Sequence, residues 1–168
     1  MRAFFGPALS DAAVPLKLSM IKVKRIDHVA IAVADRDASA QSLATLFSLT
    51  AGARERVGDQ ATDVAFLHPS DPSRDLAATD DTALEICAPA GPTGNAALTR
   101  FLARRGPGLH HVCFEVDDLP GALATLKAAG VRLIDEAPRP GARGHQVAFL
   151  HPSATGGVLF ELCAESHS

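Results

Sequence analysis

The sequence is poor in cysteine, in net charge and in long apolar runs, and it contains neither tryptophan nor tyrosine. Three cysteines cannot all pair, which argues against a secreted disulfide framework and favours a reducing, cytoplasmic setting. The 16 lysines and arginines are scattered among 19 aspartates and glutamates, so there is no electrostatic footprint for nucleic acid. No apolar run approaches the roughly 20 residues of a membrane helix, and we expect no membrane partner.

With 168 residues, 47% of them apolar, the chain has enough material for the core of one domain. We predict this single domain over residues 23–166. Residues 1–22 are predicted to be a flexible N-terminal tail, because Gly6 and Pro7 interrupt its short apolar patch and it lacks the core of a signal peptide. Met20 could also initiate the chain.

An internal duplication organises the rest of the sequence. The run IDHVAIAVAD at 26–35 matches LHHVCFEVDD at 109–118, and the match places His111 over His28 at a shift of 83 residues.

Two further matches follow in the same order. The run VAFLHPS begins at Val64 and again at Val147, which is the same shift of 83 residues. The runs LEICA and FELCA begin at Leu84 and Phe160, a shift of 76 residues. Because three matches in one order are hard to obtain by chance, we infer two copies of one structural module.

Each copy contributes one histidine on its first predicted strand and one glutamate on its last, which gives the set His28, Glu85, His111 and Glu161. Two imidazoles and two carboxylates suit a borderline divalent metal such as manganese, iron, cobalt, nickel or zinc, with room left for water or substrate. For a single residue, a satisfied core histidine or a solvated strand glutamate is the better interpretation. Four residues at equivalent positions of two copies favour a metal site.

Strand geometry places further residues beside this site. Because alternate side chains of a strand share a face, we expect His111, Cys113 and Glu115 to line a cavity while the residues between them pack on helices. Cys87 and Cys163 fall on the same face, also two residues from a proposed ligand. We expect all three cysteines to be small buried apolar residues rather than ligands.

The periodicity of apolar residues predicts the same element order in both modules. In module one (23–90) the order is strand, helix and three strands, at 23–34, 36–48, 54–57, 64–67 and 83–88. Module two (107–166) repeats it at 109–116, 119–129, 131–135, 146–150 and 158–163, after a linker helix within 91–106. We therefore predict an α+β fold in which two tandem βαβββ modules form a curled mixed sheet around a metal-containing cleft, with the helices outside.

Some details of the first module are also predicted. Asp35 is expected to cap its helix, and Gly52 to stop it. Leu46 and Phe47 belong to the apolar stripe that should face the core.

The sequence resembles a known family in four runs. These are DHVAIAV (27–33), FLARRGPGLHHVCFEVDD (101–118), GVRLIDEAPRPGARGHQVAFLHP (130–152) and GGVLFELC (156–163). The duplication resembles the vicinal oxygen chelate (glyoxalase/bleomycin resistance) superfamily, and the second copy resembles the methylmalonyl-CoA epimerases within it. The chain departs from this family in lacking tyrosines on its first helix, in its longer loop at 70–82, and in carrying Val64 where some members have a glutamate proposed as a base.

The resemblance implies metal ligands at His28, Glu85, His111 and Glu161. It implies a divalent ion, with cobalt or manganese favoured over zinc or nickel, an acyl-CoA substrate and a homodimer. The implied reaction is epimerisation of methylmalonyl-CoA, or a close 2-substituted malonyl-CoA, by removal of the α proton through a metal-stabilised enolate. Glu161 would act as ligand and as acid/base, and the second proton carrier would be Glu85, Glu115 or a bound water.

Other polar residues receive weaker assignments. Arg139 and Arg143 could meet CoA phosphates, since guanidinium groups suit phosphate. His145 is expected to be an exposed loop residue, and His110 to face away from the metal. His68 and the equivalent His151 each precede a proline at a strand end, so they are expected at turns or at the rim.

Two other functions are compatible with the same residues. A glyoxalase I-type lyase would use a similar site on a glutathione hemithioacetal, and a non-catalytic small-molecule-binding protein would use the same fold without turnover. An extradiol-type dioxygenase wants one carboxylate and two histidines, so Glu85 argues against it.

Overall fold

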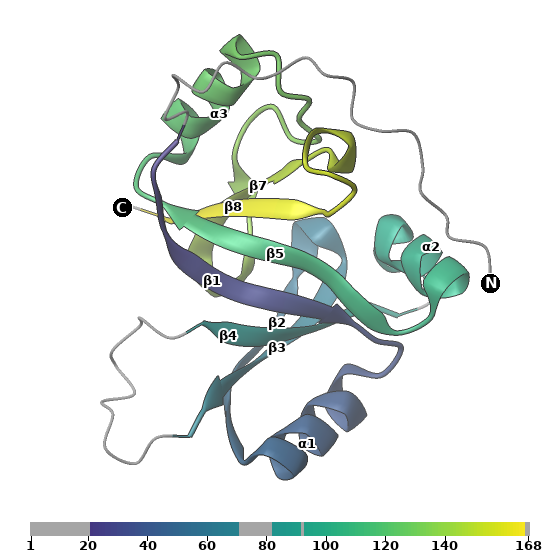
Figure 1. The fold of residues 1–168 in the computed structure, drawn as a ribbon. Coiled ribbons are helices and arrows are strands. Elements are labelled where there is room, and N and C mark those ends of the chain that lie inside the picture. The colour runs from purple at the N-terminus through teal and green to yellow at the C-terminus, as the bar shows by residue number, and fades with distance from the viewer. Residues whose placement is uncertain (1–20, 71–81, 92, 167–168) are drawn as a thin grey trace, which may run out of the picture.

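A computed structural model of the chain describes residues 21–70, 82–91 and 93–166. Residues 1–20 of the predicted tail and 71–81 of the predicted long loop lie outside this description. The described strands form one eight-stranded sheet in the order β2-β3-β4-β1-β5-β8-β7-β6 (Figure 1). Their bounds are β1 (Val23–Ala32), β2 (Leu49–Val57), β3 (Thr62–Pro69), β4 (Ala83–Pro89), β5 (Gly108–Val116), β6 (Arg139–Pro140), β7 (His145–Leu150) and β8 (Phe160–Glu165).

The strand order shows the duplication directly, because it reads the same from either edge once β5 to β8 are matched with β1 to β4. β1 pairs with β4 in parallel, β5 pairs with β8 in parallel, and β1 and β5 meet antiparallel at the centre (Figure 1). In this central pair His28 lies opposite Cys113, and Ala30 lies opposite His111. The predicted α+β fold with a curled mixed sheet is confirmed.

The helices α1 (Arg36–Phe47) and α3 (Leu119–Ala128) cover the outer face of the sheet at opposite ends of the molecule (Figure 1). α1 packs through Ala40 onto Leu67 and Ile86, and α3 packs through Leu119 and its apolar neighbours onto β7 and β8. α2 (Ala96–Arg105) takes another position, because its buried Leu98 packs with residues of the inner face. The inner face is thus left to form a cavity.

Each helix starts at a polar side chain that accepts a hydrogen bond from a free backbone N–H, as helix N-caps do. Asp35 accepts from the N–H of Ala38 at 3.0 Å, and Asp118 from that of Gly121 at 2.9 Å, as the sequence predicts.

Three β-bulges interrupt the antiparallel pairing of β1 with β5. At each, two residues of one strand face one residue of the other, and the extra residues are Lys24, Asp27 and His110. A bulge breaks the alternation of side chains, so neighbouring residues can reach the same side of the sheet. Two of the three bulges lie next to the predicted histidine ligands.

The predicted strand at 131–135 is wrong. Leu133 forms only an isolated bridge with Leu150, and the edge strand β6 is the two-residue segment Arg139–Pro140, inside the predicted loop. Pro138 and Pro140 have no N–H to donate to a ladder, so pairing at this edge is short.

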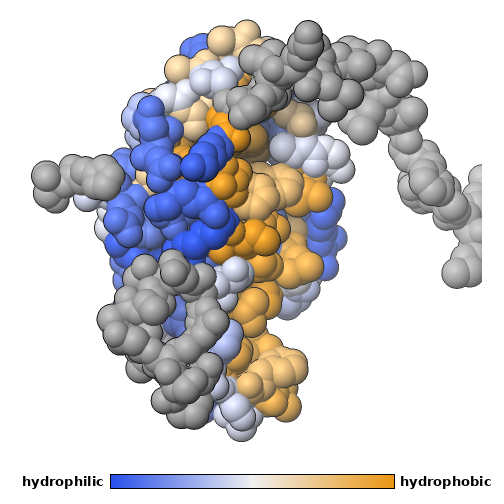
Figure 2. All heavy atoms as spheres, turned by 60° about the vertical axis from the view of Figure 1, so that its left-hand side comes forward, coloured by the Kyte–Doolittle hydropathy of each residue, from blue (hydrophilic) through white to orange (hydrophobic). Residues whose placement is uncertain are grey.

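Two predictions for the first helix are also wrong. α1 ends at Ser48, which adopts the left-handed conformation (φ 52°) and donates its N–H to the carbonyl of Ala44, before Gly52 is reached. Leu46 and Phe47 are 73% and 65% exposed, because the helix contacts the sheet through shorter side chains. On the view in Figure 2, apolar side chains form a band that reaches the end of the molecule where α1 lies.

Candidate active site and metal centre

Four buried side chains converge where the two modules meet. Glu85, His28, His111 and Glu161 come from β4, β1, β5 and β8, four neighbouring strands of the sheet. The Nε2 atoms of the two histidines lie 3.2 Å apart. The Oε2 atom of Glu161 lies 2.7 Å from Nε2 of His111 and 3.4 Å from that of His28. The Oε2 atom of Glu85 lies 3.6 Å from both Nε2 atoms.

These distances fit four ligands of one ion. Metal bonds to histidine nitrogen and carboxylate oxygen are about 2.0–2.2 Å long, which places neighbouring ligand atoms about 3–3.6 Å apart. The observed separations of 2.7 to 3.6 Å fall close to this range. The sequence therefore predicted a set of side chains that the fold brings together.

The electrostatics of the cluster favour a cation. Burial lowers the pKa of His28, but the charge of Glu85 and the hydrogen bond to Asp27 outweigh it and raise this pKa to about 10. Burial likewise raises the pKa of Glu161, but the charge of His111 and its hydrogen bond hold it well below the ordinary value. Two buried carboxylates thus retain a positive charge on an imidazole, and a divalent ion would displace that proton on binding.

Asp27 supports this cluster from behind, and the sequence reasoning missed it. Its side chain is completely buried, and its Oδ2 lies 2.8 Å from Nδ1 of His28. Arg25 donates to its Oδ1 at 2.7 Å, and Arg143 forms an ion pair with its Oδ2. Burial raises the pKa of Asp27, but the hydrogen bond of His28 and the charge of Arg143 keep it ionised. A carboxylate on the distal nitrogen fixes the ring and leaves Nε2 for a ligand.

A signal for Asp27 was present in the sequence, since it directly precedes His28. Strict alternation places it on the opposite face, and the bulge at Asp27 is what brings it beside the histidine.

His110 does not face away from the site as predicted, because it is the extra residue of another bulge. Its Nδ1 lies 2.9 Å from Nδ1 of His111, and its ring packs edge-on against Phe101 with centroids 5.0 Å apart. Burial, with the nearby charge of His111, lowers the pKa of His110 to about 4. His110 is therefore a neutral neighbour of the ligand cluster near neutral pH.

Glu115 is not on the cavity. Its carboxylate binds Nζ of Lys24 at 2.5 Å and Nε of Arg25 at 2.7 Å, and it is absent from the cavity lining. The bulge at Lys24 allows two consecutive basic residues to reach the same carboxylate. Glu115 thus forms a buried ion pair at the strand end.

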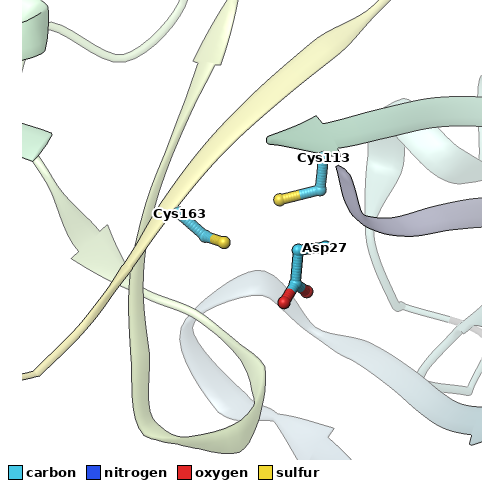
Figure 3. A group of neighbouring side chains, drawn as sticks. All are labelled: Asp27, Cys113 and Cys163. Atoms are coloured by element: carbon cyan, nitrogen blue, oxygen red, sulfur yellow. The ribbon is translucent and has the colours of Figure 1, made fainter. Parts of the chain in front are cut away.

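The cysteines are buried, as predicted. Figure 3 shows Cys113 and Cys163 with their sulfur atoms directed toward each other and toward Asp27. The ligand-type atoms of these three residues lie within 4.8 Å of one another. Both Asp27 oxygens already bind arginine or histidine, which disfavours a metal there. Cys87 packs in a separate apolar cluster on the inner face.

A cavity of about 170 Å³ opens in front of the four ligands. Val64, Phe66 and Phe149 supply apolar walls, and His145 lines it too, which makes the predicted exposed loop role of His145 wrong.

Arg143 lies inside this cavity rather than at an outer phosphate site. Its guanidinium carbon stacks 4.3 Å from the ring centroid of Phe66, and among the described residues its buried Nε has no hydrogen-bond partner. Arg139 also lines the cavity, where it pairs with Asp135 at 3.1 Å and lies over Phe149.

Comparison with known proteins identifies the family. A model of the glyoxalase/bleomycin resistance protein/dioxygenase superfamily matches residues 27–149. The chain belongs to this superfamily. It is 33% identical over 142 residues to an ethylmalonyl-CoA/methylmalonyl-CoA epimerase of Cereibacter sphaeroides, a match that covers 83% of this chain and 97% of that protein. It is also 33% identical over 142 residues to the mitochondrial methylmalonyl-CoA epimerase of Mus musculus, covering 84% and 73%.

Solved structures agree with these relatives. A variant of the Streptomyces coelicolor methylmalonyl-CoA epimerase in complex with 2-nitronate-propionyl-CoA superposes with a TM-score of 0.76 at 30% identity, and the match covers 86% of this chain and 96% of that one. The predicted resemblance is confirmed, and the superfamily member described here is an enzyme of the isomerase class. Within the described residues no helix has the length and apolar character to cross a membrane.

Proposed function

We propose that this enzyme is a divalent-metal-dependent epimerase of methylmalonyl-CoA or a close 2-substituted malonyl-CoA. The observation that carries the proposal is the convergence of His28, Glu85, His111 and Glu161 at the end of a cavity. The names of the relatives supply the substrate class, since they are epimerases of methylmalonyl-CoA or ethylmalonyl-CoA.

The four converging side chains are the proposed metal ligands, and cobalt or manganese is the proposed ion. When bound, a divalent ion would act as a Lewis acid toward the thioester and carboxylate oxygens and would stabilise the negative charge of the enolate.

Glu161 is the proposed acid/base. A carboxylate at the end of the cavity can accept the proton from the carbon between the thioester and the carboxylate of the substrate. Epimerisation then requires a proton to return to the opposite face of that carbon. Glu85 or a bound water is the proposed second carrier, and the ion pairs of Glu115 remove it from consideration.

Arg143 and the apolar walls prepare the cavity for this chemistry. The guanidinium that holds Asp27 also faces the space before the ligands, so it adds positive potential where the substrate carries a carboxylate. Val64, Phe66 and Phe149 limit the access of water, which strengthens each of these charge interactions.

A cytoplasmic homodimer is the proposed state of the enzyme. The apolar band in Figure 2 and the exposed side chains of Leu46, Phe47 and Ile26 support a second subunit, because apolar patches of this kind commonly mark interfaces.

The decisive experiment is exchange of the α hydrogen of methylmalonyl-CoA for deuterium in D2O, with cobalt or manganese added. We expect metal-dependent exchange that falls by about 10²–10⁴-fold in Glu161→Gln and is lost in His111→Ala. Glu165→Gln is the matched control, because Glu165 is an exposed glutamate of the same strand. Absence of exchange with metal bound would contradict the epimerase and favour a glyoxalase I-type lyase. Absence of both exchange and metal binding would favour a non-catalytic binding protein.

A further inference from the structure

A second hollow adjoins the cavity beside α2. Its volume is about 580 Å³, against about 170 Å³ for the cavity in front of the ligands. The two share Ala97, His110, His111 and Leu159 in their walls, so only these side chains separate them. Pockets for small-molecule ligands of moderate size are usually about 300–1,000 Å³, so the inner cavity alone suits only the acyl end of a larger substrate.

One face of α2 forms a wall of this hollow. Ala97, Arg100 and Arg104 follow one another at intervals of three and four residues, which places them on one side of a helix. Phe101 and Arg105 also line the hollow, while the buried Leu98 faces the core. α2 therefore turns three guanidinium groups toward the space that continues the cavity.

The charge of the hollow is entirely positive. Among its lining residues there are three arginines and no aspartate or glutamate, although the whole chain carries a net charge of −3. Arg100, Arg104 and Arg105 form no ion pair with any other residue that the structure describes. Positive groups gathered in this way, without acidic partners, attract an anionic ligand.

The hollow also has an apolar part. Leu109 and Val158 line it and are 73% and 46% exposed, which leaves large apolar side chains in contact with water. Exposed apolar surface beside a basic cluster suits a ligand with an uncharged arm and a phosphorylated end.

We propose that this hollow, which we call the α2 groove, binds the phosphates of the CoA part of the substrate. The acyl group occupies the inner cavity, the pantetheine arm passes His110 and Leu159, and Arg100 and Arg104 bind phosphate oxygens through charge-assisted hydrogen bonds. The inference rests on the proposed function for the acyl end, but it assigns the phosphates to residues outside the metal centre.

Kinetics with two thioesters of the same acyl group test this assignment. Methylmalonyl-CoA carries the phosphates, and methylmalonyl-N-acetylcysteamine lacks them. In the double variant Arg100→Ala/Arg104→Ala we expect KM for the CoA thioester to rise about tenfold with kcat unchanged, the effect of two exposed charge pairs. KM for the truncated thioester should not change. Arg132→Ala removes an exposed arginine outside both hollows and is the matched control.

Direct binding of CoA, followed by calorimetry without turnover, separates this inference from the epimerase proposal. If the enzyme showed no epimerase activity, weaker CoA binding in the double variant would still support the α2 groove. An unchanged KM for methylmalonyl-CoA, or an equal rise for both thioesters, would overturn it. The single charge reversal Arg104→Glu provides a second variant on an exposed position, and it should weaken CoA binding more than Arg104→Ala does.

Discussion

The Oδ2 atom of Asp27 lies 2.8 Å from Nδ1 of His28, so a fully buried carboxylate sets the orientation of a ring whose other nitrogen belongs to the candidate metal centre. Arg25 and Arg143 in turn hold the carboxylate, so the position of His28 depends on a network that extends to both modules.

Asp27→Asn keeps the size of the side chain and removes its charge. We expect metal affinity to fall about 10–100-fold, because the carboxylate partner of a ligating histidine fixes its tautomer and raises its basicity. Titration with cobalt, followed by calorimetry, measures the change. Asp59→Asn, at an exposed aspartate, is the control, and equal affinities in the two variants would contradict the role of Asp27.

Glu115 should make stability depend on pH. Burial raises its pKa, but hydrogen bonds from Lys24 and Arg25 outweigh this and lower it below the ordinary value of 4.5. Because the folded-state pKa is the lower one, the stabilisation is present above pH 4.5 and is lost as pH falls through the lowered pKa. Glu115→Gln should therefore reduce the free energy of unfolding by about 1–3 kcal/mol at pH 7.

The same variant should match the wild type in acid, and urea unfolding at both pH values measures this. Glu165→Gln, at an exposed glutamate, should change neither value. A loss of stability in Glu115→Gln that is equal at both pH values would argue against the ion pair as its cause.

Cys163 should be the reactive thiol of the three. Its hydrogen bond with Cys113 lowers its pKa to about 7, whereas burial raises the pKa of Cys113 well above the ordinary value. Cys163 also lines the cavity, and Cys113 does not. Since the thiolate is the nucleophile, alkylation by iodoacetamide should modify Cys163 first, with a midpoint near pH 7. Peptide mapping by mass spectrometry checks the order, and earlier modification of Cys113 would show the assignment to be wrong.

Gly141 has no room for a side chain. A Cβ atom there would lie 2.5 Å from Cγ1 of Val147, a buried residue whose branched side chain has little freedom to move. We expect Gly141→Ala to cost about 1–3 kcal/mol of stability and to shift the turn that carries Arg143. Gly58→Ala meets nothing within 4 Å and should leave the unfolding midpoint unchanged or slightly raised, so thermal unfolding of the pair measures the crowding.

The sequence predicted the fold and the four converging side chains because the duplication carries both. A repeat at constant spacing places His28 and His111 at equal positions, and alternation along regular strands then points them, with Glu85 and Glu161, to one face. What it missed follows from local departures from regular pairing. The bulge at Asp27 moved a carboxylate beside His28, and a sequence pattern of period two cannot show where a bulge falls.

The other wrong predictions also have local causes. The last turn of α1 is apolar but has no part of the sheet beneath it, so Leu46 and Phe47 remain exposed. The segment 131–135 has β-branched residues, but the prolines that follow prevent a regular edge strand.

At the centre of the sheet Val29 lies opposite Val112, and these valines occupy equal positions in the two copies. A pseudo-twofold axis therefore passes between them, with His28 and Glu85 on one side and His111 and Glu161 on the other. An isolated module would carry only half of the ligand set and would have to associate with an identical module to complete it. An ion held by all four side chains would act as a non-covalent clamp between the halves, so its affinity would report on how well the two modules stay together.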